Sequence, residues 1–301
     1  MGNPFLSFSD HLVSLVEQTG RSAVAVHARG RLNSSGVHWT PGIVVTTSHT
    51  IRQDEDIRVT TSSGTTLAAE LAGRDPGTDL AVLRVAGLDS PAITRAEDVD
   101  LKPGTIVLSV GRFKDSTSAA LGLLSSVSGP SDTWRGGKLD RVLRLDIGLP
   151  AGGAGGAVVI SAGKLIGIAT PALSRFSVFA IPVSTVTRVT EKLLKHGRIP
   201  RGYLGISLQP VAIIEQLRSK LNLEATSGVI AISVDPDGPA GKAGMTMGDV
   251  LLNLGERATP SPEAVHAALD ADSIGKKLAA RILRGGNAVD LEIIIGERPV
   301  K

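Results

Sequence analysis

Three separate segments of the sequence carry residue types that together can catalyse acyl transfer. His49 ends the apolar segment 42–51 (GIVVTTSHTI), and Asp79 directly precedes the apolar run 80–85. A glycine-rich turn follows at 149–159 (LPAGGAGGAVV). A histidine can act as a general base, an aspartate can orient it, and backbone N–H groups freed by glycines can stabilise an oxyanion. Each segment alone is weak evidence, but their order along the chain favours an acyl-transfer site.

Other kinds of chemistry find no support in the sequence. Cysteine is absent, and none of the six histidines is paired at i+2 or lies in an H-E-x-x-H pattern, so we expect no metal site. The sequence contains no phosphate-binding loop, and we expect no organic cofactor. A net charge of +3 with scattered basic residues and few aromatic residues argues against nucleic-acid binding.

The elements that must position the three segments are short and rich in β-branched residues. From residue 21 to about 183, apolar runs of strand length are separated by Gly, Pro, Asp and Ser. This spacing is typical of an all-β barrel or sandwich and leaves no room for helical crossovers. The region is long enough for two small barrels, and a helix ending at Gly197 closes it. We therefore predict a mainly β fold here.

The two ends of the chain have a different texture. Residues 1–20 have the spacing of an amphipathic helix, with Phe5 and Phe8 near its start. Residues 199–301 mix strands with two helical segments and predict a compact α+β domain. The expected organisation is a helical segment 1–20, a β domain 21–198 and an α+β domain 199–301.

Two groups of motifs make the chain resemble the HtrA/Deg family. TTSHTI, TDLAVLRV and GGAGGAVV are similar to that family's T-N-x-H-V, T-D-L-A-V-L-K-V and G-N-S-G-G-P-L-V segments. RGYLGI and AGMTMGDVLLNLGE resemble the start and the A-G-L-x-x-G-D-V-I core of its PDZ domain. The resemblance implies a trypsin-like double β-barrel with its active site between the barrels, followed by a smaller PDZ domain. It also implies a serine endopeptidase of protein quality control or regulated proteolysis.

Carried over onto this sequence, the resemblance implies a role for each residue of the glycine turn and its partners. His49 is then the general base, Asp79 orients it, and the backbone N–H groups of Gly152 and Ala154 form the oxyanion hole. The nucleophile position falls on Ala154, which has no hydroxyl, so we expect this chain to be inactive. Two explanations stay open, a natural pseudoprotease that binds peptides and a Ser-to-Ala substitution introduced into an active protease. The retention of His49 and Asp79 favours the second.

Two peptide-binding regions are implied by the same resemblance. A primary specificity pocket that prefers small or medium apolar side chains is expected from Ile147, Gly148 and Leu149, with Ile168, Ala169 and Thr170 opposite. In the PDZ domain, the expected carboxylate-binding loop is Tyr203, Leu204, Gly205 and Ile206, and Val265, Ala268 and Leu269 are expected to line the groove.

The expected partners follow from these regions. They are unfolded or misfolded polypeptide substrates, peptide C-termini at the PDZ groove, and two further copies in a homotrimer joined by N-terminal segments. No run of residues is long and apolar enough for a membrane span. The first twenty residues lack the pattern of an export signal, which favours the cytoplasm for the sequence as written. The alternative is the periplasm or cell envelope, if a leader has been trimmed.

Overall fold

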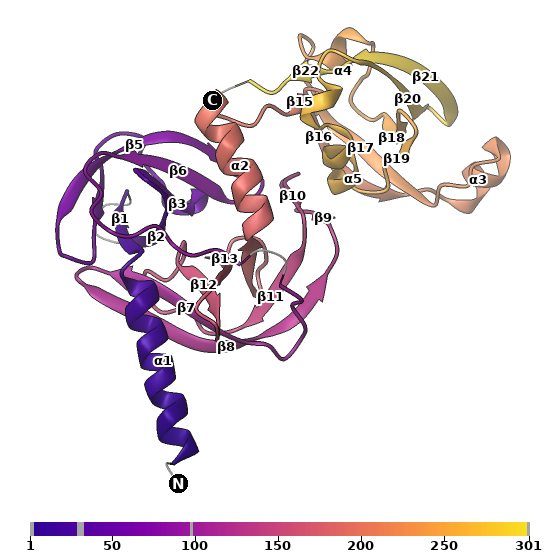
Figure 1. Cartoon of the computed structure of the whole chain (residues 1–301). Coiled ribbons are helices and arrows are strands. Elements are labelled where there is room, and N and C mark those ends of the chain that lie inside the picture. Colours follow the sequence, from indigo (N-terminus) through magenta and orange to yellow (C-terminus); the bar gives the residue numbers. More distant parts are fainter. Residues whose placement is uncertain (1–2, 29–32, 97–98, 300–301) are drawn as a thin grey trace. The chain divides into compact units, whose positions relative to one another are not determined.

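The chain forms two compact units, Met1–Ile199 and Pro200–Lys301. A computed structural model describes residues 3–28, 33–96 and 99–299 (Figure 1). The sequence predicts the boundary between residues 198 and 199, and the structure divides the units between Ile199 and Pro200.

The first unit contains two closed six-stranded barrels with antiparallel strand pairs. Short β-branched runs separated by glycine-containing turns suit this architecture, because each strand alternates between the barrel interior and its outer surface. The first barrel has the strand order β1-β2-β3-β6-β5-β4. Its strands are β1 Ala23–His27, β2 Ser34–Thr40, β3 Ile43–Thr47, β4 Ile57–Thr60, β5 Thr66–Asp75 and β6 Leu80–Val85.

The second barrel has the order β11-β14-β13-β12-β7-β8. Its core contains Leu124, Leu143 and Val158, all essentially unexposed. The prediction of a mainly β fold with two barrels is confirmed. Its strands are β7 Ile106–Phe113, β8 Ser116–Ser128, β11 Val142–Asp146, β12 Ala157–Ile160, β13 Leu165–Thr170 and β14 Val178–Pro182, and the short strands β9 Ser131–Asp132 and β10 Lys138–Leu139 form a separate hairpin.

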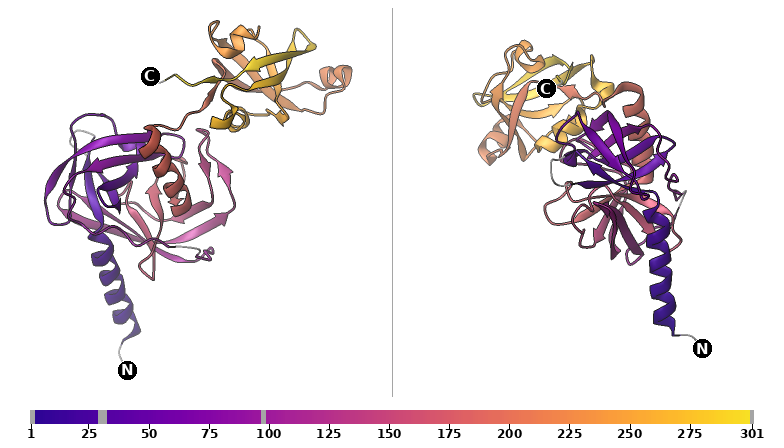
Figure 2. Two further views of the ribbon diagram at one scale, coloured as in Figure 1. Left: turned by 45° about the horizontal axis from the view of Figure 1, so that its top comes forward. Right: turned by 90° about the vertical axis from the view of Figure 1, so that its left-hand side faces the viewer.

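Two helices accompany the barrels. Helix α1 (Pro4–Gly20) is capped by the Asn3 side chain, which accepts a hydrogen bond from the Phe5 N–H. Its last turns pack on β7 and β8, while its first turn extends away from the barrels, as Figures 1 and 2 show. Helix α2 (Val183–His196) packs on β5 and β6 of the first barrel and on β13 and β14 of the second. It therefore fastens the two barrels together.

The second unit is a five-stranded antiparallel sheet, extended by one short strand and flanked by short helices. The order is β16-β17-β18-β20-β21, which leaves β16 at an edge. Its core includes Val229, Leu251 and Ile282. The remaining elements are β15 Gly202–Tyr203, β16 Ile206–Ala212, α3 Glu215–Leu221, β17 Ser227–Val234, α4 Pro239–Lys242, β18 Val250–Leu254, β19 Arg257–Ala258, α5 Pro262–Ala268, β20 Lys277–Arg284, β21 Asn287–Ile294 and β22 Gly296–Glu297.

Candidate active site and peptide groove

A histidine and an aspartate meet at one end of the first barrel. His49 lies in the single helical turn after β3, and Asp79 lies just before β6, which pairs with β3. The His49 Nδ1 atom is 2.8 Å from Asp79 Oδ2 and 3.1 Å from Oδ1. The His49 side chain is 24 % exposed and that of Asp79 only 1 %. The histidine can thus reach a substrate while its partner is sealed from water.

The Asp79 carboxylate is oriented by its own backbone and by the turn before it. Asp79 has a φ of 61°, a left-handed conformation that Asp tolerates better than most residues. The preceding turn is tied by Asp75, whose carboxylate accepts hydrogen bonds from the N–H groups of Gly77 and Thr78. The Asp79 Oδ1 atom also accepts the His49 backbone N–H at 2.9 Å. The ring of His49 therefore has a fixed partner on its Nδ1 side.

A threonine from the second barrel completes this arrangement. The Thr170 hydroxyl, at the end of β13, donates to Asp79 Oδ2 at 2.5 Å. Its neighbour Ala169 accepts a hydrogen bond from the Gly155 N–H at 2.8 Å. One strand of the second barrel thus holds both the aspartate and the glycine turn. The turn also lies beside the first barrel, because the Ser35 N–H of β2 donates to the Ala154 carbonyl at 2.9 Å.

The carbonyl groups of the glycine turn are held on the protein side. Those of Gly152, Gly153 and Ala154 accept hydrogen bonds from the Ser35 hydroxyl, the Gly156 N–H and the Ser35 N–H, respectively. In a trans peptide the N–H of one residue lies opposite the C=O of the residue before it, so the bond to the Gly153 carbonyl fixes the direction of the Ala154 N–H. Among the described residues, no protein acceptor is found for the N–H groups of Gly152 and Ala154. They are the N–H groups that the sequence analysis assigned to an oxyanion hole.

Position 154 itself carries only a methyl group. Ala154 is half-buried, as a residue reachable by a substrate would be, and both Gly152 and Gly155 have left-handed φ values that favour glycine. The turn can therefore present backbone N–H groups but no nucleophilic atom at this position. Neither Ser161 nor Ser174 belongs to it, since both follow the turn in sequence, outside residues 149–159.

The residues expected in a specificity pocket fall into two groups. Ile147, Gly148 and Leu149 are half-buried or exposed in the segment leading to the turn. Ile168, Ala169 and Thr170, which the sequence predicts on the opposite side of the pocket, are fully buried. The reason is their place in β13, where Ile168 and Ala169 belong to two hydrophobic cores and Thr170 binds Asp79. Of these six residues, only Ile147 and Leu149 have partly exposed side chains.

The second unit contains a loop with a comparable backbone arrangement. In the loop between β15 and β16, the carbonyls of Leu204 and Gly205 accept the N–H groups of Ala240 and Asp235. Within the described part of the chain, the N–H groups of Leu204 and Gly205 donate to no protein group. Strand β16, which follows at once, is an edge strand that can pair with an extended peptide.

Helix α5 and its C-cap hold the apolar residues that the sequence predicts beside the peptide groove. Val265, Ala268 and Leu269 are at most 9 % exposed and belong to the core of the second unit. These side chains lie on the inner face, where they cover the sheet. The half-buried side chains beside the loop are those of Ile206 and Leu208 on β16. These two are better placed to contact a bound peptide.

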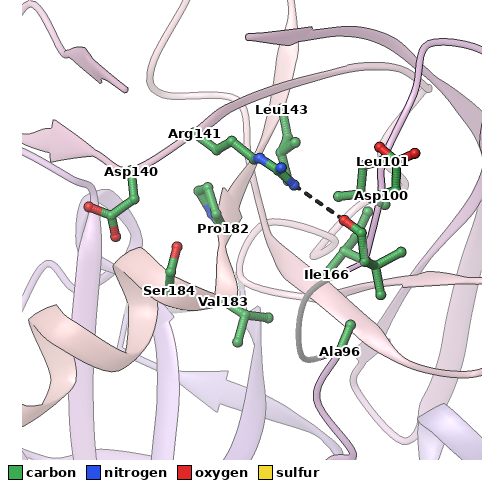
Figure 3. A pocket seen from close by; sticks show the side chains of 11 residues that line it. Ala96, Asp100, Leu101, Asp140, Arg141, Leu143, Ile166, Pro182, Val183 and Ser184 are labelled. Atoms are coloured by element: carbon green, nitrogen blue, oxygen red, sulfur yellow. Dashed lines mark hydrogen bonds between the residues drawn. The ribbon is translucent and has the colours of Figure 1, made fainter. Parts of the chain in front are cut away.

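A separate pocket of about 650 Å³ lies in the second barrel, beside the start of α2. Arg141, labelled in Figure 3, is one of the residues that line it. Its guanidinium donates a hydrogen bond to the Val99 carbonyl at 3.3 Å. The pocket includes none of the predicted site residues. Among the described residues, no group of His, Asp and Glu is placed to hold a metal ion. In the same residues, no helix is long and apolar enough to cross a membrane.

Two contributors to the site were missed by reasoning from the sequence. The Thr170 hydroxyl was assigned to a pocket wall, and Ser35 was not assigned at all. Both act across long sequence separations, 91 residues for Thr170 to Asp79 and 117 for Ser35 to Gly152. No local spacing pattern signals such contacts, so only the three-dimensional structure shows them.

Family models match both units of the chain. Residues 34–168 match the family model of the trypsin-like peptidase domain, and residues 202–295 match that of the PDZ domain. Both matches fall within the two units of the fold.

Curated relatives match nearly the whole chain. A probable periplasmic serine endoprotease, DegP-like, from Halomonas elongata is 29 % identical over 279 residues, covering 90 % of this chain and 57 % of the relative. One from Pseudomonas putida (strain W619) is 30 % identical over 277 residues, covering 89 % and 56 %. The chain spans just over half the length of these curated relatives.

Solved structures of similar proteins match over almost their full length. The serine endoprotease from Yersinia pestis is 29 % identical with a TM-score of 0.73, covering 95 % of this chain and 98 % of that one. The HtrA-type protease AlgW with tripeptide is 26 % identical with a TM-score of 0.71, covering 96 % and 98 %. By these matches the chain is similar to HtrA- and DegP-type serine proteases, and it contains a trypsin-like peptidase domain followed by a C-terminal PDZ domain.

Proposed function

We propose that the chain has the architecture of a serine endopeptidase of protein quality control that acts on unfolded or misfolded polypeptides. The observation that carries this proposal is the joint positioning by β13. Its Thr170 binds the aspartate that orients His49, and its Ala169 holds the glycine turn. A histidine with a purely structural role would not require one strand to bind both its aspartate partner and the glycine turn.

In the proposed mechanism, a nucleophile at position 154 attacks the scissile carbonyl while His49 Nε2 takes its proton. Asp79 holds Nδ1–H and stabilises the imidazolium that forms. The N–H groups of Gly152 and residue 154 receive the oxyanion of the tetrahedral intermediate. His49 then donates its proton to the leaving amine, and water repeats the sequence on the acyl-enzyme.

We propose that the chain with Ala154 is inactive as a protease. Residual hydrolysis then comes only from the oxyanion hole and substrate binding, a loss on the order of 10⁶ in kcat relative to an intact triad. The origin of Ala154 has two explanations, natural loss and an introduced substitution. Retention of the His49–Asp79 pair and the glycine turn favours the second.

Replacing Ala154 with serine tests the proposed function. The Ala154→Ser variant is expected to degrade casein and to be labelled by a fluorophosphonate, because one hydroxyl restores the missing nucleophile. The double variant Ala154→Ser/His49→Ala is the matched control and is expected to lose both properties. A folded Ala154→Ser protein that neither cleaves nor reacts would reject the proposal.

The second candidate function is peptide binding without cleavage. Position 154 lacks a nucleophile, whereas the Leu204 and Gly205 N–H groups and the β16 edge need no further side chain to act. We propose that this loop receives a peptide C-terminus with an apolar last residue, near Ile206 and Leu208. Isothermal titration with such a peptide tests this; equal affinity for its C-terminally amidated form would contradict it.

We also propose that α1 joins copies of the chain into a homotrimer. Phe5 is 82 % and Leu6 62 % exposed on its first turn, and Phe8 lines an apolar pocket with Ile106 of β7. Exposed apolar side chains gathered on one element are typical of an interface. Light scattering that gives the mass of a monomer at micromolar concentration would remove this proposal.

A further inference from the structure

Ser35, in β2 of the first barrel, makes side-chain hydrogen bonds to two segments of the chain that are distant in sequence. Its side chain is fully buried, and its hydroxyl donates to the Gly152 carbonyl at 2.7 Å. The same oxygen accepts the Arg112 backbone N–H at 2.9 Å. A serine hydroxyl has one proton to donate, and Gly152 is the nearer of its two acceptors, since the Arg112 carbonyl is 3.4 Å away. The direction of the hydroxyl is therefore set.

The glycine turn needs such an external contact. Residues 152, 153, 155 and 156 are glycines, so the backbone around Ala154 has many accessible conformations and no side chains to restrain it. The peptide unit between Gly152 and Gly153 is held from both sides, because its carbonyl binds the Ser35 hydroxyl and its N–H binds the Pro150 carbonyl at 2.8 Å. Rotation of this unit changes ψ of Gly152 and φ of Gly153. These two torsions lie between the peptide that carries the Gly152 N–H and the peptide that carries the Ala154 N–H. If the Gly152–Gly153 peptide is not held, they can change independently, and the two N–H groups then no longer keep a fixed direction relative to each other.

Ser35 is itself held firmly in place. Its carbonyl accepts the Thr46 hydroxyl at 2.6 Å, and its N–H donates to Ala154. The strand that carries Arg112 is anchored by that residue's buried guanidinium, which donates to the carbonyls of Ala23, Gly20 and Asp115. Gly111 leaves the space for the serine, since a Cβ there would lie 2.3 Å from Ser35 Oγ.

We propose that Ser35 is a positioning residue for the oxyanion hole, whose hydroxyl holds the Gly152–Gly153 peptide so that the Gly152 and Ala154 N–H groups point to the substrate. The proposal rests on the proposed function, because it assigns these N–H groups to the oxyanion. Ser35 does not touch the reacting atoms. It acts through the backbone that does.

The test compares two buried serines in the Ala154→Ser background. Ser35→Ala removes the hydrogen bond to the turn, and Ser90→Ala removes a hydrogen bond of similar kind to His38 Nδ1, at 3.1 Å. Ser35→Ala is expected to lower kcat for a peptide substrate about 10- to 100-fold with KM changed less than about threefold, because the transition state alone carries the oxyanion. Ser90→Ala is expected to leave both constants within about twofold of the Ala154→Ser protein.

The thermal midpoints of both variants separate positioning from stability. A kcat for Ser35→Ala equal to that of Ser90→Ala at matched stability would overturn the proposal. If Ser35→Ala fails to fold, Ser35→Cys in the same background keeps a weak donor at this position. Its kcat is expected to lie between that of the Ala154→Ser protein and that of the chain with Ala154. An unchanged kcat for a folded Ser35→Cys protein would likewise overturn it.

A failure of the proposed function is distinguishable from a failure of this inference. If Ala154→Ser is inert, the proposed function fails, and Ser35 is then tested in the chain as it stands by amide hydrogen exchange. Ser35→Ala is expected to speed exchange of the Gly153 and Gly155 amides about tenfold or more, with Ser90→Ala unchanged. Equal exchange in the two variants would overturn the clamping role.

Discussion

The first and second units each present unused backbone N–H groups from a glycine-containing loop, but they differ in what else they need. In the first unit, the turn 152–156 can stabilise an oxyanion only after a side-chain oxygen has attacked, and Ala154 supplies none. In the second unit, the loop around Gly205 can receive a carboxylate with backbone groups alone. A site that depends on one side-chain atom is lost by one substitution, whereas a backbone site depends on loop conformation.

The two sites also differ in how they are supported. The first is held by buried side chains from distant segments, among them Thr170 on Asp79 and Ser35 on Gly152. The second is held by main-chain bonds from residues 235 and 240. We therefore expect side-chain substitutions to damage the first site most, and backbone substitutions to damage the second.

The largest expected effect is at Asp79. In the Ala154→Ser background, Asp79→Asn is expected to lower kcat by about 10⁴, because the asparagine amide favours the wrong tautomer of His49. Initial rates with a peptide substrate measure it, and circular dichroism confirms the fold. A loss below about tenfold would show that His49 does not depend on this carboxylate.

A backbone substitution in the second unit should give the next largest effect. Gly205 has a φ of 78°, and a Cβ there would lie 3.1 Å from Gly238 Cα. Gly205→Ala is expected to weaken binding of an apolar C-terminal peptide about tenfold or more, because the loop must move to relieve the contact. The left-handed conformation itself costs about 1–2 kcal/mol for alanine.

Gly286 offers a matched control for Gly205. It has the same φ of 78°, and the nearest atom to its Cβ position is Leu217 Cδ1 at 4.0 Å. Gly286→Ala therefore carries the same conformational cost without the close contact, and peptide affinity is expected to stay unchanged. Equal weakening by both substitutions would mean that the loop around Gly205 has no special role in binding.

The smallest expected effect concerns acid stability of the second unit. Asp249 is 2 % exposed in its side chain and binds Arg284 Nε at 2.8 Å. Burial alone would raise its pKa, but hydrogen bonds from Arg284 and Thr246 outweigh burial and lower the pKa of Asp249 below its usual value. A lowered native pKa stabilises the fold above the unfolded-state pKa, and this contribution is lost as pH falls through the native pKa.

Urea unfolding followed at the β18 amide resonances, at pH 7 and near pH 3, measures this contribution. The urea midpoint of the parent chain is expected to be lower near pH 3 than at pH 7. In Asp249→Asn this difference is expected to be smaller, because the asparagine side chain does not titrate. The same pH dependence in both proteins would show that the Asp249–Arg284 pair does not couple folding to protonation. The first unit serves as the internal reference.

Much of the fold follows from local sequence. Runs such as IVVTT and LAVLRV predict strands because β-branched residues suit a pleated surface, and the glycines and prolines between them mark turns. The apolar residues of α5 were predicted to line a groove, but the pattern gives only the apolar face. It does not say whether that face covers the sheet or a ligand, and in the structure Val265 lies in the core.

The sequence by itself determined the strand-rich character of residues 21–183, the presence of His49, Asp79 and the glycine turn, and the absence of a hydroxyl at position 154. These depend on residue types and short-range spacing. Only the tertiary structure decided which polar groups support the site, because Thr170 and Ser35 reach their partners through barrel closure and strand pairing between distant segments. A hydrogen bond depends on distance and direction in space, and both are set once the two barrels have packed.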